Sequence, residues 1–154
     1  TSQLQVEGTL PAVAGILTVD TVIVAADSDG APVVLGQPPA ADDWQQTVRE
    51  WFERYYFGRT HEALSAVCVS TPDGRRAEVV VSTRVQSGAA TAPWLDWYLA
   101  SGEPIGKAGG YGLQGAGSLF VERIDGSPSN VIGLPLRETA QLLGDLGIQL
   151  AHEQ

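Results

Sequence analysis

Residues 101–136 read SGEPIGKAGGYGLQGAGSLFVERIDGSPSNVIGLPL and hold the most distinctive pattern in the chain. Seven of the eighteen glycines fall between Gly102 and Gly117. Glycine lets backbone N–H groups approach an anion or a base closely, and it permits turns that other residues resist. The stretch also holds the only lysine, Lys107. A turning loop that faces a ligand is one interpretation, and a glycine-rich surface loop without a ligand is the other.

Two familiar phosphate-binding motifs are excluded in this stretch. Residues 110–115, GYGLQG, match the G-x-G-x-x-G spacing, but that fingerprint needs a helix after it, and the residues that follow predict a strand over 118–124. The Gly-Lys pair at 106–107 does not belong to a P-loop, because other residues stand where its first glycine and its Ser/Thr are required. The polar side chains left on the loop are Lys107, Tyr111 and Gln114.

Upstream, residues 13–26 (VAGILTVDTVIVAA) are rich in β-branched residues. They would be apolar on both faces of a strand, which predicts a central strand. Asp20 in its middle would be buried, and an unpaired buried charge is costly. Its carboxylate must therefore be protonated, paired, metal-bound or at the open end of the strand. The alternative is a side chain that turns into solvent or caps a loop. Thr21 would face the opposite side.

The rest of the chain alternates strands, turns and helices, without an internal repeat or a low-complexity linker. Apolar residues at spacings of three and four predict a helix over 42–57, capped by Asp42 and stopped by Gly58. The other expected elements are a returning strand at 32–35, a hairpin of 62–70 and 77–86, a short helix at 93–101, a short extended piece at 130–133 and a helix at 136–146. The expected fold is a single mixed α/β domain over residues 1–154.

Composition limits the partners. Nine basic and eighteen acidic residues give a net charge of −9, which repels nucleic acids and anionic membranes, so neither is an expected partner. No apolar run has the length of a membrane span. A single cysteine, Cys68, cannot form an internal disulfide, which favours a reducing, cytoplasmic compartment. The chain begins at Thr1 and contains no methionine, so we expect its natural N-terminus to be missing or processed.

No further catalytic cluster is indicated. His61 stands alone at the start of a strand, and together with His152 it gives no metal-site spacing. Cys68 lies in an apolar run and is expected in the core. Tryptophans at 44, 51, 94 and 97 have helical spacing and indicate core or interface positions.

The long block at 101–136 closely resembles the signature block of the Maf family of nucleotide pyrophosphatases, also described as septum-formation-inhibitor-like proteins. Shorter resemblances follow in the order of that family. They are VDTVIV (19–24), LGQPPA (35–40), GRTHEALSAVCV (58–69) and VVVSTRV (79–85). The resemblance as a whole covers roughly residues 15–148 without large gaps. The long block is specific, and the short pieces gain their weight from their order.

The resemblance implies a mixed α/β fold similar to inosine-triphosphate pyrophosphatases, with an extended, twisted mixed sheet, flanking helices and a cleft. It implies hydrolysis of a nucleoside triphosphate between the α and β phosphates, which gives the monophosphate and pyrophosphate. The Asp-Thr pair together with Tyr-Gly-x-Gln resembles the branch that acts on dTTP and UTP. A homodimer is also expected, since family members commonly pair and the aromatic helix at 42–57 offers surface to bury.

By position, Asp20 corresponds to the family's proposed proton acceptor, which activates water near a divalent cation, Mg²⁺ or Mn²⁺. Thr21 and Gln114 correspond to positions linked to base choice. Lys107 corresponds to a lysine that faces the phosphates. The substrate-binding residues expected from the resemblance are Thr21, Gln37, Lys107, Tyr111 and Gln114.

Two departures from the family pattern leave two hypotheses. The family opens with a Ser-x-Ser-Pro-Arg-Arg loop that holds the phosphates and a helix that supplies a Glu and a Lys, and residues 1–14 match none of these. The lysine of the family's Gly-Lys-Pro loop is Gln37 here. A pyrophosphatase is favoured by four intact residues, Asp20, Thr21, Lys107 and Gln114. Gln37 favours a shortened domain that binds nucleotide or a protein partner without hydrolysis, and a purely structural domain would do neither.

Overall fold

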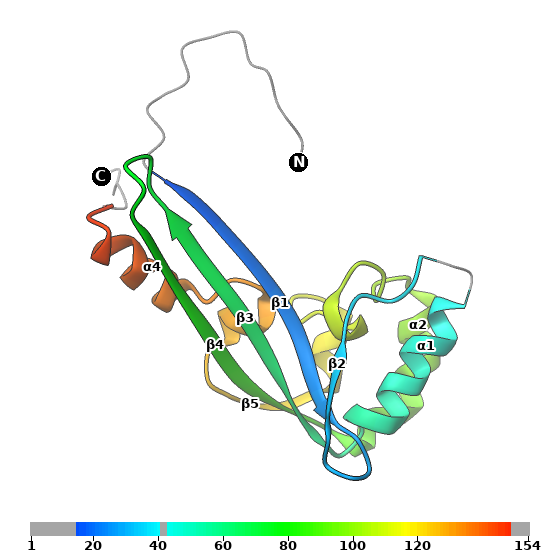
Figure 1. The fold of residues 1–154 in the computed structure, drawn as a ribbon. Helices are drawn as coiled ribbons and strands as arrows, with labels where there is room; N and C mark the ends of the chain where they lie inside the picture. Colours follow the sequence, from blue (N-terminus) through cyan, green and yellow to red (C-terminus); the bar gives the residue numbers. More distant parts are fainter. Residues whose placement is uncertain (1–14, 41–42, 149–154) are drawn as a thin grey trace, which may run out of the picture.

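A five-stranded sheet organises the molecule in the computed structural model, which describes residues 15–40 and 43–148 (Figure 1). The strand order is β2-β1-β3-β4-β5, and every adjacent pair is antiparallel. The strands are β1 (Ile16–Ala26), β2 (Pro32–Leu35), β3 (Thr60–Ser70), β4 (Arg76–Ser87) and β5 (Val121–Asp125). The predicted mixed α/β class, with an extended sheet and flanking helices, is confirmed.

Both predicted hairpins form. The β1–β2 turn is held by the Asp27 carboxylate, which accepts the backbone N–H groups of Asp29 at 2.9 Å and Ala31 at 2.8 Å. Such bonding of an Asp side chain to the backbone ahead of it favours a turn over a continued strand. Strands β3 and β4 pair along their whole length, from Thr60 opposite Gln86 to Ser70 opposite Arg76. This long hairpin is the blade that extends to one side of the molecule in Figure 1.

Helix α1 (Trp44–Trp51) continues into a π-helical turn, η1 (Phe52–Tyr56), and the run ends before Gly58. Gly58 has a φ of +68°, which a glycine adopts without strain, so the predicted stop is confirmed. The predicted cap, Asp42, lies outside the described residues. Helix α2 (Leu95–Ala100) follows a 3₁₀ turn, η2 (Ala89–Trp94), and lies beside α1 (Figure 1).

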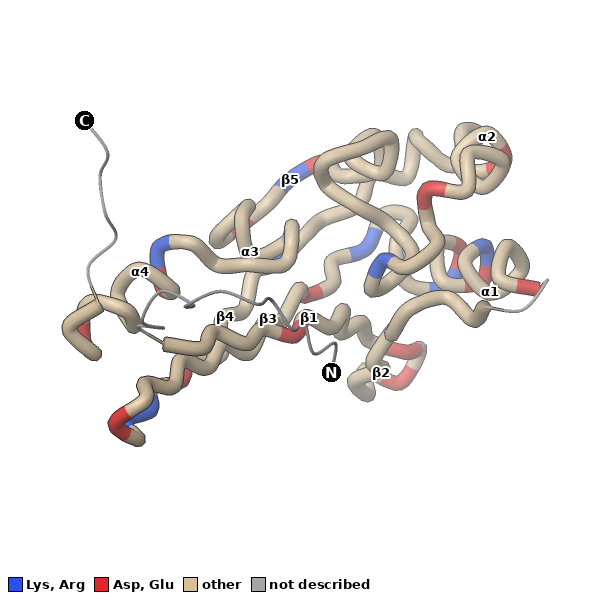
Figure 2. The backbone as a smooth tube through the Cα atoms, turned by 90° about the horizontal axis from the view of Figure 1, so that it is seen from above, with Lys and Arg blue, Asp and Glu red and all other residues tan. Residues whose placement is uncertain are grey.

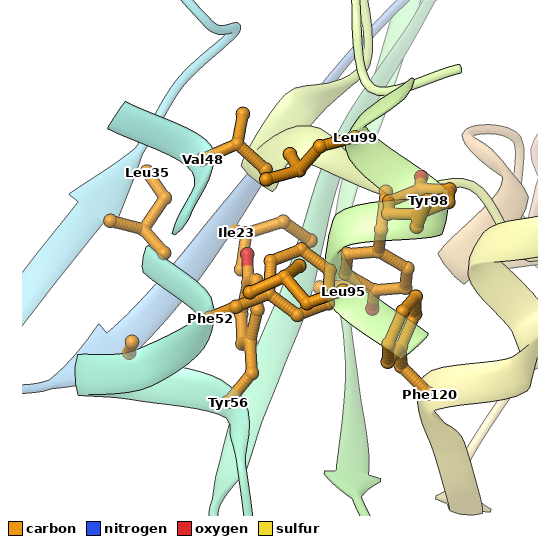
Figure 3. Close-up of a cluster of buried hydrophobic side chains, with 12 residues drawn as sticks. Ile23, Leu35, Val48, Phe52, Tyr56, Leu95, Tyr98, Leu99 and Phe120 are labelled. Atoms are coloured by element: carbon orange, nitrogen blue, oxygen red, sulfur yellow. The ribbon is translucent and has the colours of Figure 1, made fainter. Parts of the chain in front are cut away.

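The main core lies between α1, α2 and the covered face of β1 (Figure 3). Phe52, Tyr98 and Phe120 form its centre, with the ring centroids of Phe52 and Phe120 4.8 Å apart and those of Tyr98 and Phe120 5.1 Å apart. Edge-to-face aromatic contacts at these distances add to the stabilisation from burial. Two of the four tryptophans, Trp44 and Trp51, pack against this core, whereas Trp94 and Trp97 are exposed.

A second, smaller core forms where α4 (Leu136–Asp145) packs on the blade. Leu142 and Leu146 cover Val67 and Val69 of β3. Because side chains alternate along a strand, the even-numbered residues of β3 face the other side of the sheet. Cys68 is on that side and only partly buried, so the expectation of a core cysteine is wrong.

Three sequence-based expectations are corrected. The strand expected at 118–124 begins only at Val121, because Ala116–Phe120 form a 3₁₀ turn, η4. The extended piece expected at 130–133 is instead part of helix α3 (Pro128–Ile132), which begins with proline at a position that favours helix starts. The first half of β1, expected to be apolar and covered on both faces, is exposed, because the main core covers only its second half, at Ile23 and Ala25, and α4 packs mainly on β3 and β4.

No helix among the described residues combines the length and apolar character needed to cross a lipid bilayer.

Because α4 packs on the blade, replacement of valine by alanine should affect the free energy of unfolding very differently at two positions. Val67 is 1% exposed under α4, whereas Val80, on the neighbouring strand, is 69% exposed on the open face. We expect Val67→Ala to lower the free energy of unfolding by about 2 kcal/mol, from lost burial and the cavity left behind. Val80→Ala, the matched control, should cost less than about 0.5 kcal/mol. Urea denaturation measures both, and equal losses would contradict the packing described.

Candidate active site

One cavity of about 400 Å³ lies between the edge of β1, the glycine-rich loop and the end of α3. All of the site residues predicted from the sequence line it. They are Asp20, Thr21, Gln37, Lys107, Tyr111 and Gln114. These residues come from three separate parts of the chain, so only the fold brings them together.

Asp20 lies on the half of β1 that β2 does not cover, and its side chain is exposed. Its Oδ1 accepts the backbone N–H of Thr21 at 2.9 Å. Asp20 stands in the middle of β1 and not at its end, so the expectation that this carboxylate is buried is wrong, and the alternative, a side chain that turns into solvent, is the one found. An exposed carboxylate at a cavity rim is accessible both to water and to a cation.

Thr21 points to the opposite side of β1, as predicted. Its hydroxyl shares a hydrogen bond with the Ser65 hydroxyl at 2.7 Å and donates to the Gly133 carbonyl oxygen at 3.3 Å. The side chain is therefore fixed between β3 and the end of α3. A fixed hydroxyl at a cavity wall can distinguish ligands by shape and by hydrogen bonding.

The glycine-rich loop is held against β1 and η1 at Gly109. The Gly109 N–H donates to the Gly36 carbonyl oxygen at 2.8 Å, and the Tyr56 hydroxyl donates to the Gly109 carbonyl oxygen at 2.8 Å. Gly109 has a φ of +69°, and a Cβ there would lie only 2.6 Å from Ile23 Cγ1. Glycine is therefore required at this position both by conformation and by close approach.

Lys107 places its aliphatic stem over Gly112, where an added Cβ would lie 2.6 Å from Lys107 Cε. Its side chain forms no ion pair within residues 15–40 and 43–148. Acidic positions are distributed over several elements of the backbone (Figure 2), whereas residues 104–121, which include the loop around Lys107, contain none. On this acidic chain Lys107 thus supplies a positive charge to the cavity, which suits an anionic ligand.

Glu103 is a residue that the sequence analysis missed. Its carboxylate accepts the backbone N–H groups of Ala116 at 2.8 Å and Gly117 at 3.0 Å, so it ties the end of the glycine-rich loop to its beginning. Gly115 leaves room for this carboxylate, because an added Cβ would lie 2.5 Å from Oε1. An acidic residue inside a glycine-rich stretch is the signal that could have indicated this role.

The sequence analysis named His61 but did not predict it to support the site. It is buried, and its Nε2 shares a hydrogen bond of 2.8 Å with the Tyr111 hydroxyl. Burial lowers the pKa of His61 to about 4, because the charged imidazolium would lose its hydration. Burial likewise raises the pKa of Tyr111. Both groups are therefore neutral at neutral pH. His152, the other histidine, lies outside the described residues.

The donor side chains at the cavity limit the kind of metal ion that it could hold. Within residues 15–40 and 43–148, no three His, Cys, Asp or Glu side chains cluster in a way that could hold a metal ion. Asp20 is thus a single carboxylate donor at the cavity. This fits Mg²⁺, which proteins commonly bind through one or two carboxylates while substrate phosphates and water fill the remaining positions. It does not fit a cage made of protein ligands alone.

Removal of the Glu103 carboxylate should loosen the loop. We expect Glu103→Ala to lower the free energy of unfolding by about 2–3 kcal/mol, because two backbone N–H groups lose charge-assisted hydrogen bonds. The amides of Ala116 and Gly117 should also exchange faster with deuterium. Glu122→Ala, which removes an exposed glutamate of β5, should change stability by less than about 0.5 kcal/mol. Unchanged exchange at both amides would contradict the role of Glu103.

Burial of His61 predicts a pH dependence of stability. The unfolded chain protonates this imidazole near pH 6.5, whereas the folded chain does so only near pH 4. Between these values the unfolded state binds more protons, so the free energy of unfolding falls as the pH falls, by about 2 kcal/mol at pH 5. Above about pH 6.5 both states are neutral and this contribution is constant.

The non-titrating variant His61→Gln provides the comparison. Denaturation between pH 8 and pH 5 should show a steeper decline for the unaltered chain than for the variant. Other groups titrate alike in both and cancel in the difference. Parallel curves would contradict the burial of a neutral imidazole.

Comparison with known proteins places the chain in a family. The family model described as Maf-like protein matches residues 2–146, and thus extends further toward the N-terminus than the motifs suggested. A dTTP/UTP pyrophosphatase of Anaeromyxobacter dehalogenans (strain 2CP-1) is 41% identical over 142 residues, which cover 90% of this chain and 68% of the relative. One of Cupriavidus metallidurans is 43% identical over 135 residues, covering 88% and 62%. The chain therefore spans about two thirds of the length of these relatives, and it belongs to the Maf-like protein family.

Proposed function

We propose that this chain hydrolyses a nucleoside triphosphate of the dTTP/UTP type to the monophosphate and pyrophosphate. The observation that carries the proposal is a single cavity lined by Asp20, Thr21, Lys107 and Gln114, in a chain whose relatives bear the name dTTP/UTP pyrophosphatase. A relative from Sphingopyxis alaskensis with that name is 50% identical over 93 residues, which cover 60% of this chain and 49% of the relative.

The chemistry assigns each residue a role. The exposed Asp20 carboxylate accepts a proton from a water molecule whose oxygen attacks the α-phosphorus. The bond from that phosphorus to the bridging oxygen breaks, and its electron pair leaves with pyrophosphate. The Lys107 ammonium stabilises negative charge on the phosphate oxygens as the bond breaks. A divalent cation, Mg²⁺ or Mn²⁺, would be held by Asp20 and the phosphates and would neutralise charge on the triphosphate.

Base selection falls to two other residues that line the cavity, Thr21 and Gln114. Thr21 is fixed by Ser65 and Gly133, and Gln114 offers an exposed amide on the loop. An amide both donates and accepts hydrogen bonds, which suits the alternating carbonyl and N–H groups at the edge of a pyrimidine such as thymine or uracil. Gln37 lines the cavity as a neutral group and supports binding without adding charge.

A second candidate function is nucleotide binding without hydrolysis. Gln37 favours it, because the family has a lysine there and a neutral amide neutralises none of the charge on a triphosphate. From the family resemblance we further propose a homodimer located in the cytoplasm. The exposed pair Trp94 and Trp97, with ring centroids 6.2 Å apart, supports a contact surface.

Release of pyrophosphate from dTTP and UTP with Mg²⁺ or Mn²⁺ tests the proposal. We expect turnover by the unaltered chain and at least about a 100-fold loss in Asp20→Asn, because the amide cannot accept the proton. Asp29→Asn, the same substitution in the exposed β1–β2 turn, should leave the rate unchanged. Nucleotide binding without release of pyrophosphate would instead establish the second candidate. Absence of both binding and release would exclude both functions.

A further inference from the structure

Three rings meet behind the cavity wall, on the side away from solvent. The centroid of the His61 ring lies 4.5 Å from that of Tyr56 and 5.5 Å from that of Tyr111, and the centroids of the two tyrosine rings are 5.5 Å apart. Tyr56 holds the Gly109 carbonyl, and His61 holds the Tyr111 hydroxyl. Two successive points of the glycine-rich loop are therefore fixed by this cluster.

Burial of the His61 imidazole reduces the stability of the fold, because one of its ring nitrogens is left unpaired within the described part of the chain. His61 is 2% exposed, and its Nδ1 has no hydrogen-bond partner among the described residues. A buried polar atom without a partner destabilises a protein, and an apolar side chain of similar size would avoid this loss. The bond from Nε2 to Tyr111 is the contact that such an apolar replacement could not make.

Tyr111 joins this buried bond to the cavity. It lines the cavity, whereas His61 does not. Since the Tyr111 hydroxyl is engaged with His61, its ring has one fixed place in the wall. Lys107 and Gln114 lie on the loop four residues before and three residues after Tyr111. The position of this ring thus constrains the part of the loop that supplies both polar groups to the cavity.

We propose that His61 is a positioning residue for nucleotide binding, which acts by holding the hydroxyl of Tyr111 and so fixing the cavity wall between Lys107 and Gln114. The proposal rests on the proposed function, because it assumes that the cavity receives a nucleotide. His61 itself does not touch the ligand. Its effect therefore falls on binding rather than on the reacting atoms.

The test measures binding of a UTP analogue with an imido bridge between the α and β phosphorus atoms, which resists hydrolysis, by calorimetry on the full chain. Tyr111→Phe keeps the ring and removes the hydroxyl, and His61→Leu removes the partner. Loss of one hydrogen bond should raise the dissociation constant about threefold to tenfold in each. His61→Gln keeps a hydrogen-bonding group near the position of Nε2 and should restore most of the affinity.

The double variant His61→Leu with Tyr111→Phe separates positioning from a general loss of structure. If His61 acts through Tyr111, the double variant should bind no more weakly than Tyr111→Phe alone, because the two changes remove the same bond. Thr71→Val is the structural control. It removes a buried hydroxyl that donates to the Asp73 carboxylate and lies 3.1 Å from the Arg75 carbonyl oxygen. Thr71 directly follows β3 and lies roughly 30 Å from His61 along the direction of that strand, so the substitution should leave binding unchanged.

The possible outcomes distinguish failure of the positioning role from failure of the proposed activity. Unaltered affinity in Tyr111→Phe, additive losses in the double variant, or an equal loss in Thr71→Val would overturn the positioning role. If the unaltered chain also hydrolyses UTP, KM should rise in Tyr111→Phe while kcat changes less than about twofold, since the lost bond serves binding. Binding without hydrolysis would overturn the proposed activity alone. Absence of binding by the unaltered chain would overturn both.

Discussion

The close approach of Gly109 to β1 and to the Tyr56 hydroxyl is the contact on which the cavity depends. The backbone N–H of Gly109 donates to the loop after β2, and its carbonyl accepts from η1. No side chain fits at this position, so the loop can lie directly against the sheet. Because Lys107 and Tyr111 are two residues away on either side, this one contact sets their distance from Asp20. The wall of the site is thus built from backbone hydrogen bonds, with few side chains between.

Around that contact, buried polar groups fix the loop from several directions. Glu103 holds its end, His61 holds Tyr111, and the Tyr98 hydroxyl donates to the Gly110 carbonyl oxygen at 3.3 Å. A loop rich in glycine loses much backbone entropy when it is ordered. Hydrogen bonds that satisfy buried donors and acceptors offset this loss. Charge adds a further constraint, since a net charge of −9 opposes binding of a nucleotide. In the proposed function, Lys107 and a bound divalent cation would supply the local positive charge that offsets this repulsion.

Much of the fold was predictable because its signals are local. Turn residues and alternation indicated both hairpins, and spacing of apolar residues together with Gly58 indicated α1 and its end. Helix α3 was missed because its stability comes from elsewhere in the chain. The Asn130 amide donates to the carbonyl oxygens of Ala63 at 2.9 Å and Val81 at 3.2 Å, both more than forty residues away in sequence. Only Pro128, after Ser127, indicated a helix start locally.

The sequence by itself indicated which residues to expect at the site, because Asp20, Thr21, Lys107 and Gln114 lie in motifs that resemble those of one family. Tertiary structure alone decided that these residues share a cavity and that Asp20 is exposed. An apolar strand pattern reports what a strand can bury, and whether a helix covers its faces depends on packing between distant segments. The same holds for His61, whose partner lies fifty residues away, at a distance that no local pattern encodes, whereas Glu103, with a partner thirteen residues away, had a local signal in its place within a glycine-rich stretch.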